Sequence, residues 1–205
     1  MTKVFVSGSM KIKNLDDKVI DRLNNIVASK YSVIVGDADG VDSSIQEYLK
    51  QHGVSTVTVY CSGAKPRNNI GHWKIKSIFT TSQPGTRAYF TAKDKEMAAD
   101  CDYGFMVWDA RSTGTLSNAI ELVERKKIAL VYVNKAKQFL KIKDVQDLEK
   151  LLGFMSEVSL KKADDKIGLL RKIEGMKFSQ DDLFVAERSA PAYARAPAPR
   201  RQRRG

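Results

Sequence analysis

The chain has 205 residues, long enough for one ordinary domain with a sizeable core and an appendage. Its two cysteines, Cys61 and Cys101, lie far apart and lack the paired spacing of a zinc site, so we expect neither a disulfide framework nor a metal centre. No run approaches the roughly 18 consecutive apolar residues that a membrane span needs, and no secretory signal is visible. These features predict a cytoplasmic protein without a membrane partner.

The formal net charge of +11 is concentrated at the end of the chain. Residues 186–205 hold six arginines and one acid, Glu187, hence a net charge of +5 in twenty residues. The segment also holds three of the five prolines and few large apolar residues, so we expect a disordered tail. It is either an arm for nucleic acid or a solubilising or localising extension. The arginines expected to contact nucleic acid are Arg200, Arg201, Arg203 and Arg204.

Short apolar runs alternate with segments of helical periodicity along the first part of the chain. Strands are expected at 3–9, 32–35, 56–60, 103–108 and 128–133, and helices around 16–27, 41–52, 92–99 and 116–125. The strands are nearly continuous in apolar residues, which is typical of strands covered by helices on both faces. The pattern therefore predicts an α/β fold with a doubly wound, Rossmann-like parallel sheet.

The rest of the chain is less regular. Residues 62–89 are rich in Gly, Pro, Asn and Lys, and a connection of this length is usually a functional loop or disordered. After Asn134 we expect a short edge strand at 139–142, a helix at 145–152 and a further helix around 167–173. The predicted organisation is a nucleotide-binding domain over 1–155, a helical extension over 156–184 and the tail over 185–205.

The first candidate ligand contacts lie at the end of the first strand. Ser7, Gly8 and Ser9 combine a glycine, which lets a ligand approach the backbone, with two hydroxyls that can bind phosphate. The alternative is an ordinary turn.

The second strand ends in Gly36-Asp37-Ala38-Asp39-Gly40-Val41-Asp42, where two glycines flank acidic residues. Asp39 or Asp42 is expected to cap the following helix. Asp37 is a candidate acceptor for ribose hydroxyls, because a carboxylate accepts paired hydrogen bonds from a diol. No nearby histidine supports a metal site.

The strongest local pattern is the apolar run 103–107 followed by the segment 108–118, which predicts a strand, a loop and a helix start. Backbone N–H groups at such a junction bind phosphate or carboxylate. The candidate contacts in this segment are Asp109, Ser112, Gly114, Thr115 and Asn118. Cations for an anionic ligand are expected from Arg67, Arg87 and Lys93, and Trp73 or Trp108 is a candidate for stacking on a base.

Over about residues 3–134, these motifs resemble the SLOG superfamily, a Rossmann-like group that includes the LOG phosphoribohydrolases and DNA-processing protein A. The LOG motif PGGxGTxxE places its Gly-Thr pair on Gly114-Thr115, but Asn118 stands at the position of the catalytic glutamate. An amide cannot act as a carboxylate nucleophile. Glu121, one turn later, and Asp109 are the candidate substitutes. The resemblance implies a homodimer and a nucleotide ligand, without a bound cofactor.

Three functions remain open at this level. The first is a sensing or regulatory module that binds a nucleotide or an ADP-ribose-like ligand. The second is an enzyme that cleaves the N-glycosidic bond of nucleoside monophosphates, using Glu121, Asp109 or Asp94. The third is nucleic-acid binding assisted by the arginine tail. Function belongs to the site rather than to the fold, so the resemblance alone does not rank these hypotheses.

Overall fold

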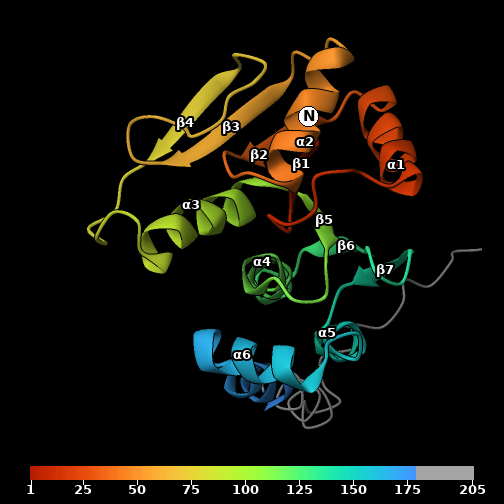
Figure 1. Ribbon diagram of the computed structural model, residues 1–205, viewed down its shortest axis with the longest axis vertical. Helices are drawn as coiled ribbons and strands as arrows, with labels where there is room; N and C mark the ends of the chain where they lie inside the picture. The colour runs from red at the N-terminus through yellow and green to blue at the C-terminus, as the bar shows by residue number, and fades with distance from the viewer. Residues whose placement is uncertain (179–205) are drawn as a thin grey trace, which may run out of the picture. The chain divides into compact units, whose positions relative to one another are not determined.

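The computed structural model describes residues 1–178, and its first compact unit, Met1–Leu169, contains the sheet and the helices around it (Figure 1). The predicted tail at 185–205, including its four terminal arginines, lies outside the described residues. One mostly parallel sheet has the order β4-β3-β2-β1-β5-β6-β7, with β7 antiparallel to β6. Its strands are β1 (Lys3–Gly8), β2 (Ser32–Gly36), β3 (Val57–Ser62), β4 (Lys74–Ile78), β5 (Tyr103–Trp108), β6 (Ile128–Val133) and β7 (Gln138–Ile142). The predicted Rossmann-like α/β class is confirmed.

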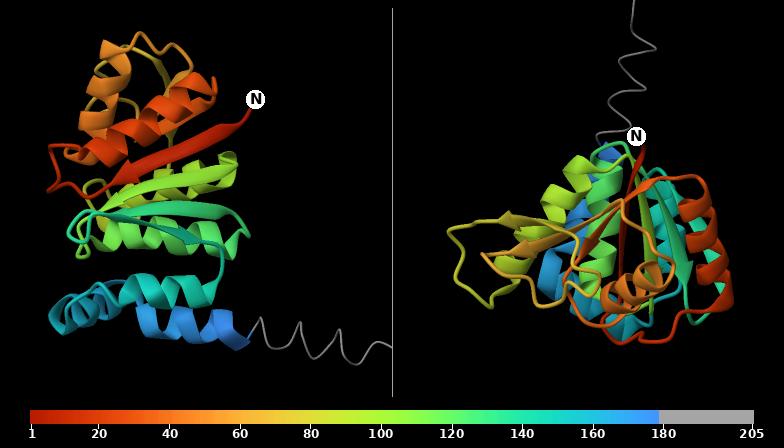
Figure 2. Two further views of the ribbon diagram at one scale, coloured as in Figure 1. Left: turned by 90° about the vertical axis from the view of Figure 1, so that its right-hand side faces the viewer. Right: turned by 90° about the horizontal axis from the view of Figure 1, so that it is seen from above.

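Helices cover both faces of this sheet. They are α1 (Asp17–Ala28), α2 (Val41–Gln51), α3 (Arg87–Asp100), α4 (Thr113–Glu124), α5 (Val145–Leu152) and α6 (Glu157–Ile167). In Figure 2, α1 and α2 lie on one face, and α3 and α4 lie on the other. In the part of the chain that the structure describes, no helix is long and apolar enough to cross a membrane.

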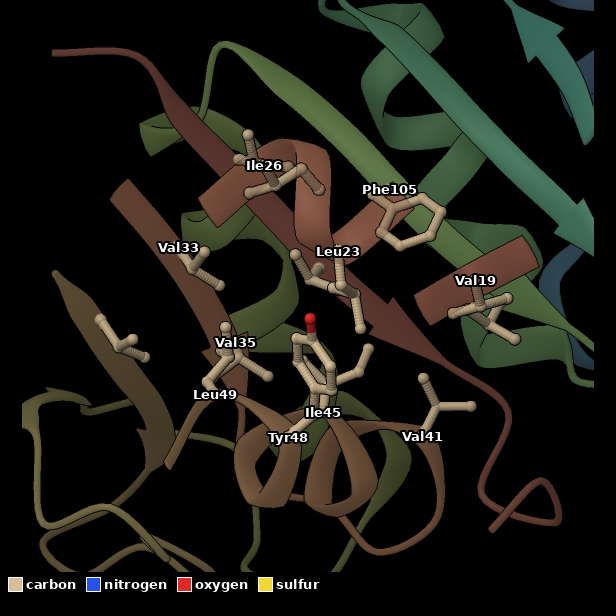
Figure 3. Close-up of a cluster of buried hydrophobic side chains, with 14 of the residues drawn as sticks. Val19, Leu23, Ile26, Val33, Val35, Val41, Ile45, Tyr48, Leu49 and Phe105 are labelled. Carbon is tan, nitrogen blue, oxygen red and sulfur yellow. The ribbon is translucent and has the colours of Figure 1, made fainter. Parts of the chain in front are cut away.

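The inner strands are nearly continuous in apolar residues because successive side chains enter different layers that are both covered by helices. Figure 3 shows Val33 and Val35 of β2 against the layer formed by α1 and α2, whereas the intervening Ile34 is buried and points to the other face. Each fully buried aliphatic or aromatic side chain stabilises the fold by about 1.5–3 kcal/mol. The hydrophobic side chains that α1 and α2 contribute to this layer of the core include Val19, Leu23, Ile26, Val41, Ile45, Tyr48 and Leu49.

Two helices begin earlier than the sequence periodicity indicates, because side-chain caps decide where they start. The α3 helix starts at Arg87 rather than near 92, since the hydroxyl of Thr86 accepts a hydrogen bond from the backbone N–H of Tyr89. The α4 helix starts at Thr113 rather than near 116, with Ser112 as its cap. Serine and threonine caps of this kind satisfy N–H groups that the helix itself leaves unpaired.

The composition of the segment 62–89 predicts an irregular loop, but the structure places the strand β4 within it. No residue of β4 is fully buried, and the strand pairs with β3 at the outer edge of the sheet. Backbone pairing therefore forms β4 without the apolar run that marks the inner strands. The alternation in Lys74-Ile75-Lys76 was the available signal.

The chain after β7 packs two helices into the same unit as the sheet. Contacts join α5 to β7 and α6 to α4. The sequence predicts the region of α6 as part of a separate helical extension. The α6 helix ends at Ile167, and its C-cap, Gly168, has the left-handed conformation (φ 60°). A further helical segment begins at 169 and continues through residue 178.

Candidate functional site

The strand-end motifs gather at one edge of the sheet. Register pairs β1 in parallel with both β2 and β5, so the carboxyl ends of these three strands lie side by side. The Ser9 hydroxyl donates to Asp109 Oδ1 at 3.0 Å, and the Ser9 carbonyl accepts from the Val41 backbone N–H at 3.4 Å. The end of β1 is thus joined directly to the loop after β5 and to the start of α2. In open α/β sheets, ligands bind at such a change of strand order.

A cavity of about 890 Å³ opens at this edge. It is lined by the ends of β1 and β5, the starts of α2 and α4, one face of α3 and part of α6. The lining contains seven cationic side chains and three acidic ones, so it is predominantly basic. The cations are Lys11, Arg67, Arg87, Lys93, Arg111, Lys162 and Lys166, and the acids are Asp42, Asp94 and Asp109.

The start of α4 is shaped as an anion-binding turn. Asp109 Oδ1 accepts from the backbone N–H groups of Arg111 (2.9 Å) and Ser112 (2.7 Å), which holds the loop closed. The next two N–H groups, those of Thr113 and Gly114, donate to no acceptor within residues 1–178. These donors, together with the helix dipole, favour an anion.

Arg87 joins the start of α3 to the start of α4. Its guanidinium donates to Thr113 Oγ1 at 3.0 Å and to Ser117 Oγ at 3.2 Å. The side chain is thereby held next to the unpaired N–H groups of α4. The arrangement brings a fixed positive charge to the same place as the helix dipole, and the planar guanidinium suits an oxyanion.

Asn118, which the LOG resemblance aligns with a catalytic glutamate, lines the cavity. Its Nδ2 donates to Ser7 Oγ at 3.0 Å, and Ser7 Oγ donates to the sulfur of Met106 at 2.9 Å. Asn118 and Ser7 are both buried. This position therefore offers an amide rather than a charge, fixed in place by β1.

Asp37 is occupied by Arg67 instead of facing the cavity. The Arg67 guanidinium contacts both carboxylate oxygens, at 2.8 and 3.1 Å, and the Arg67 backbone N–H donates at 3.0 Å. Burial opposes the ionisation of Asp37, but these hydrogen bonds and the charge of Lys93 outweigh it and hold its pKa below the ordinary value. Asp37 thus orders the segment after β3 and presents Arg67 to the cavity, where the guanidinium lies over the Phe90 ring at 4.6 Å.

Asp42 and Lys93 form the most deeply buried charged groups of the cavity, each 4% exposed. Asp42 Oδ1 accepts from the Gly8 backbone N–H at 3.3 Å. A Cβ at Gly36 would lie 2.4 Å from Asp42 Oδ2 and 2.8 Å from Lys93 Nζ, so the glycine leaves the space that both groups use. Burial raises the pKa of Asp42 to about 7, against the opposing effect of Lys93. Burial also opposes the charge of Lys93, but Asp94, Asp42 and Asp37 outweigh it and hold its pKa above the ordinary lysine value.

Ten of the sequence-predicted site residues line the cavity and six do not. Those that line it are Ser7, Gly8, Arg67, Arg87, Lys93, Asp109, Ser112, Gly114, Thr115 and Asn118. Those outside the lining are Ser9, Gly36, Asp37, Asp39, Gly40 and Glu121. Most of the six shape the walls, as the contacts of Ser9, Gly36 and Asp37 show, while Asp39 accepts from Asn68 Nδ2 at 3.0 Å.

Glu121 lies one helical turn beyond Ser117 and Asn118 on α4 and does not line the cavity. It pairs with Arg125 at 2.8 Å, an ion pair within one helix. Neither tryptophan reaches the cavity, since Trp108 is fully buried and Trp73 Nε1 donates to the Val54 carbonyl at 2.8 Å. Phe90 is the aromatic side chain on the cavity wall.

The cavity residues that the site prediction missed come mostly from helices, with Met10, Lys11, Ala38 and Arg111 on loops. The expected capping of α2 by Asp39 or Asp42 was wrong, because the cap is Gly40 and no side chain caps this helix. The contribution of α6 was not anticipated. Lys162 and Lys166 are four residues apart, so they share one helix face, and this spacing was the available signal. Among the described residues, no group of three or more His, Cys, Asp or Glu side chains is arranged to hold a metal ion.

In comparisons with protein-family models, curated proteins and solved structures, nothing matched this chain.

Proposed function

We propose that the protein binds a nucleotide or an ADP-ribose-like ligand in the cavity at the β1–β5 edge, in a sensing or regulatory role. The observation that carries this proposal is the coincidence of unpaired helix N–H groups, a fixed arginine and a cavity of about 890 Å³ at the change of strand order. Cavities of about 300–1,000 Å³ are typical of small-molecule sites, and this one is near the upper end.

The phosphate is expected at the start of α4. Two N–H groups there, on Thr113 and Gly114, have no acceptor in the described chain, and Arg87 is held beside them. An oxyanion at this position completes the hydrogen bonding of the helix and meets the positive end of its dipole. Arg111 on the adjoining loop adds a further cation to the wall.

The contacts of the acidic residues favour binding over the family's glycosidic chemistry. Asn118 supplies an amide at the glutamate position, Glu121 is paired outside the cavity, and Asp109 already accepts three hydrogen bonds through Oδ1. The SLOG resemblance agrees with this proposal, because it rests on the same strand-end motifs. An Asn118→Glu variant that gained hydrolysis of nucleoside monophosphates, where the wild type has none, would support a binding role for the wild type.

The proposal is tested by thermal unfolding of the full chain with nucleoside monophosphates, cyclic nucleotides, NAD and ADP-ribose, each compared with inorganic phosphate. A ligand that binds the folded state at 100 times its Kd stabilises it by about 2.7 kcal/mol, which raises the melting temperature. At least one of these compounds is expected to do so where phosphate at equal concentration does not.

The matched variants are Arg87→Ala in the cavity and Arg125→Ala, outside the cavity lining, at the end of α4. We expect the first to weaken binding by about tenfold, as for a lost charged hydrogen bond, and the second to leave it unchanged. No shift with any nucleotide, or equal loss in both variants, contradicts the proposal.

A further inference from the structure

Asp42 is the one buried acid on the cavity wall, whereas Asp94 and Asp109 are half-buried. Of the three acids on the cavity wall, Asp109 holds its own loop and Asp94 accepts from Lys93 Nζ at 2.7 Å. Asp42 uses only Oδ1, toward the Gly8 N–H, and Oδ2 accepts no hydrogen bond within residues 1–178. Asp42 is only 4% exposed and lines the cavity, so the exposed part of its side chain faces the cavity.

The surroundings of Asp42 suit a group that both donates and accepts hydrogen bonds. Lys93 Nζ and Asp42 Oδ2 lie on the same side of Gly36. Because Gly36 has no side chain, the space around these two atoms stays open. Adjacent sugar hydroxyls can donate to a carboxylate and accept from an ammonium at once. A phosphate dianion, in contrast, carries no donor and would be repelled by the ionised Asp42 carboxylate.

We propose that Asp42, with Lys93 beside it, binds the vicinal hydroxyls of the ligand's ribose, so that the cavity selects ribonucleotides over deoxyribonucleotides. This inference rests on the proposed nucleotide function and specifies how that site reads the sugar. It replaces Asp37, which Arg67 occupies, as the acceptor for the ribose.

The selectivity depends on the charge of Asp42, and therefore on pH. The charged groups that influence it come from α3, from the loop after β2 and from the segment after β3, namely Lys93, Asp94, Asp37 and Arg67. Burial raises the Asp42 pKa to about 7, so the carboxylate accepts two hydroxyl donors above neutral pH and is protonated below it. The preference for ribose is therefore expected to fall as the pH is lowered from 8 to 6.

The experiment measures the affinity of the full chain for AMP, 2′-deoxy-AMP and 3′-deoxy-AMP by calorimetry at pH 8. The wild type is expected to bind AMP about tenfold more tightly than either deoxy compound, as for the loss of one hydrogen bond to a charged group. Asp42→Asn is expected to bring the three affinities within about twofold. Glu47→Gln, the same charge change on the exposed side of α2, is the control and retains the preference.

Inosine monophosphate shows whether Asp42 instead contacts the base. If Asp42→Asn removes discrimination between AMP and inosine monophosphate but not between AMP and its deoxy forms, the sugar assignment is overturned. Equal binding of AMP and deoxy-AMP by the wild type also overturns it while leaving the nucleotide proposal standing. Absence of any nucleotide binding by the wild type removes both proposals.

The pH profile of the wild type tests the inference without any variant, so a failure of Asp42→Asn to fold does not decide the outcome. The quantity is the ratio of the AMP and 2′-deoxy-AMP affinities, in which the titration of the ligand phosphate cancels. A ratio that falls toward one between pH 8 and pH 6 supports the role of Asp42. A constant ratio contradicts it.

Discussion

At the scale of single residues, the site is a set of charges whose partners decide their roles. Asp37 and Asp42 are five residues apart and both buried, yet one has a lowered pKa and the other a raised one. The difference lies in Arg67, which contacts both oxygens of Asp37. Asp37 is consequently a structural anion, while Asp42 remains available to a ligand.

Replacing Arg67 by methionine is expected to lower the free energy of unfolding by about 2 kcal/mol at pH 7. Breaking a buried ion pair costs about 3–5 kcal/mol, and we expect less here because the Arg67 side chain is 40% exposed. Because the Asp37 pKa is lowered by folding, this contribution is present above the ordinary carboxyl pKa of about 4 and is lost as the pH falls below it.

Urea unfolding at pH 7 and at pH 3 measures the effect. Arg125→Met, which removes the surface pair with Glu121, is the control and is expected to cost less than about 0.5 kcal/mol. Equal losses in the two variants at pH 7 would show that Asp37 does not depend on Arg67.

The raised pKa of Asp42 predicts the opposite pH dependence. The folded state keeps a proton that the unfolded state releases, so between about pH 4 and pH 7 the stability of the wild type falls with rising pH by up to about 1.4 kcal/mol per unit from this residue. Asp42→Asn removes this contribution and is expected to be the more stable protein at pH 8. A constant difference between the two proteins from pH 5 to pH 8, measured by chemical unfolding, would contradict the burial of a titrating carboxyl group.

At the scale of elements, the site depends on how two chain segments approach at the start of α2. Gly40 has a φ of 81°, and a Cβ there would lie 2.3 Å from the Met10 carbonyl oxygen. Only glycine fits this conformation and this space, which brings the loop after β1 against the start of α2. Met10 and Lys11 on that loop line the cavity.

Gly40→Ala is expected to destabilise the protein by about 3 kcal/mol, because left-handed strain and a backbone clash add. Gly53, with a φ of 62° and no atom near its missing Cβ, is the control, and Gly53→Ala is expected to cost only about 1 kcal/mol of strain. Thermal unfolding compares the two. Similar losses would indicate that the Met10 contact is not essential.

The inner strands and the edge strand β7 were predictable from the sequence, and the other edge strand, β4, was not. Strands β1, β2, β5 and β6 are recognisable in the sequence as nearly continuous apolar runs, because helices cover both of their faces. The β4 strand lacks that signal because pairing, not burial, forms it. The start of α3 was misplaced because the Thr86 cap, and not an apolar repeat, decides where the helix begins.

The site was predictable where a strand end carries the residue. Ser7 and Gly8 end β1, and Gly114 and Thr115 come shortly after β5, whose carboxyl end lies beside that of β1. The role that we propose for Asp42 was not predictable from the sequence. It requires that Arg67 pair with Asp37 and not with Asp42, and Arg67 lies about thirty residues from Asp37 in the chain. The lysines of α6 depend in turn on the packing of α6 against α4.

At the scale of the whole molecule, the cavity is assembled from stretches that lie far apart in the chain. The β1 end, the α3–α4 region and α6 all contribute to its wall, and each cavity residue lies before 167. Nucleotide binding therefore does not require the basic tail in our account. The homodimer, the cytoplasmic location and nucleic-acid binding through the tail stay predictions.

Truncation after Val185 removes a net charge of +5 and is expected to leave nucleotide affinity within about twofold at 150 mM salt, where charges beyond about 8 Å are largely screened. The same truncation is expected to weaken any salt-sensitive binding of nucleic acid by the full chain. Calorimetry with AMP and a filter assay with duplex DNA separate the two activities. A large loss of AMP affinity would place the tail at the ligand site.

The most direct measurement of the central claim is a map of backbone amide resonances in the full chain as AMP or ADP-ribose is added. A ligand held by the strand ends and the start of α4 is expected to shift the amides of residues 7–11 and 112–115 first and most strongly. The amides at the opposite edge of the sheet, near 101–103 and 126–128, are expected to stay in place. Shifts confined to that opposite edge, or no shifts at millimolar nucleotide, would contradict the assignment of this cavity as a nucleotide site.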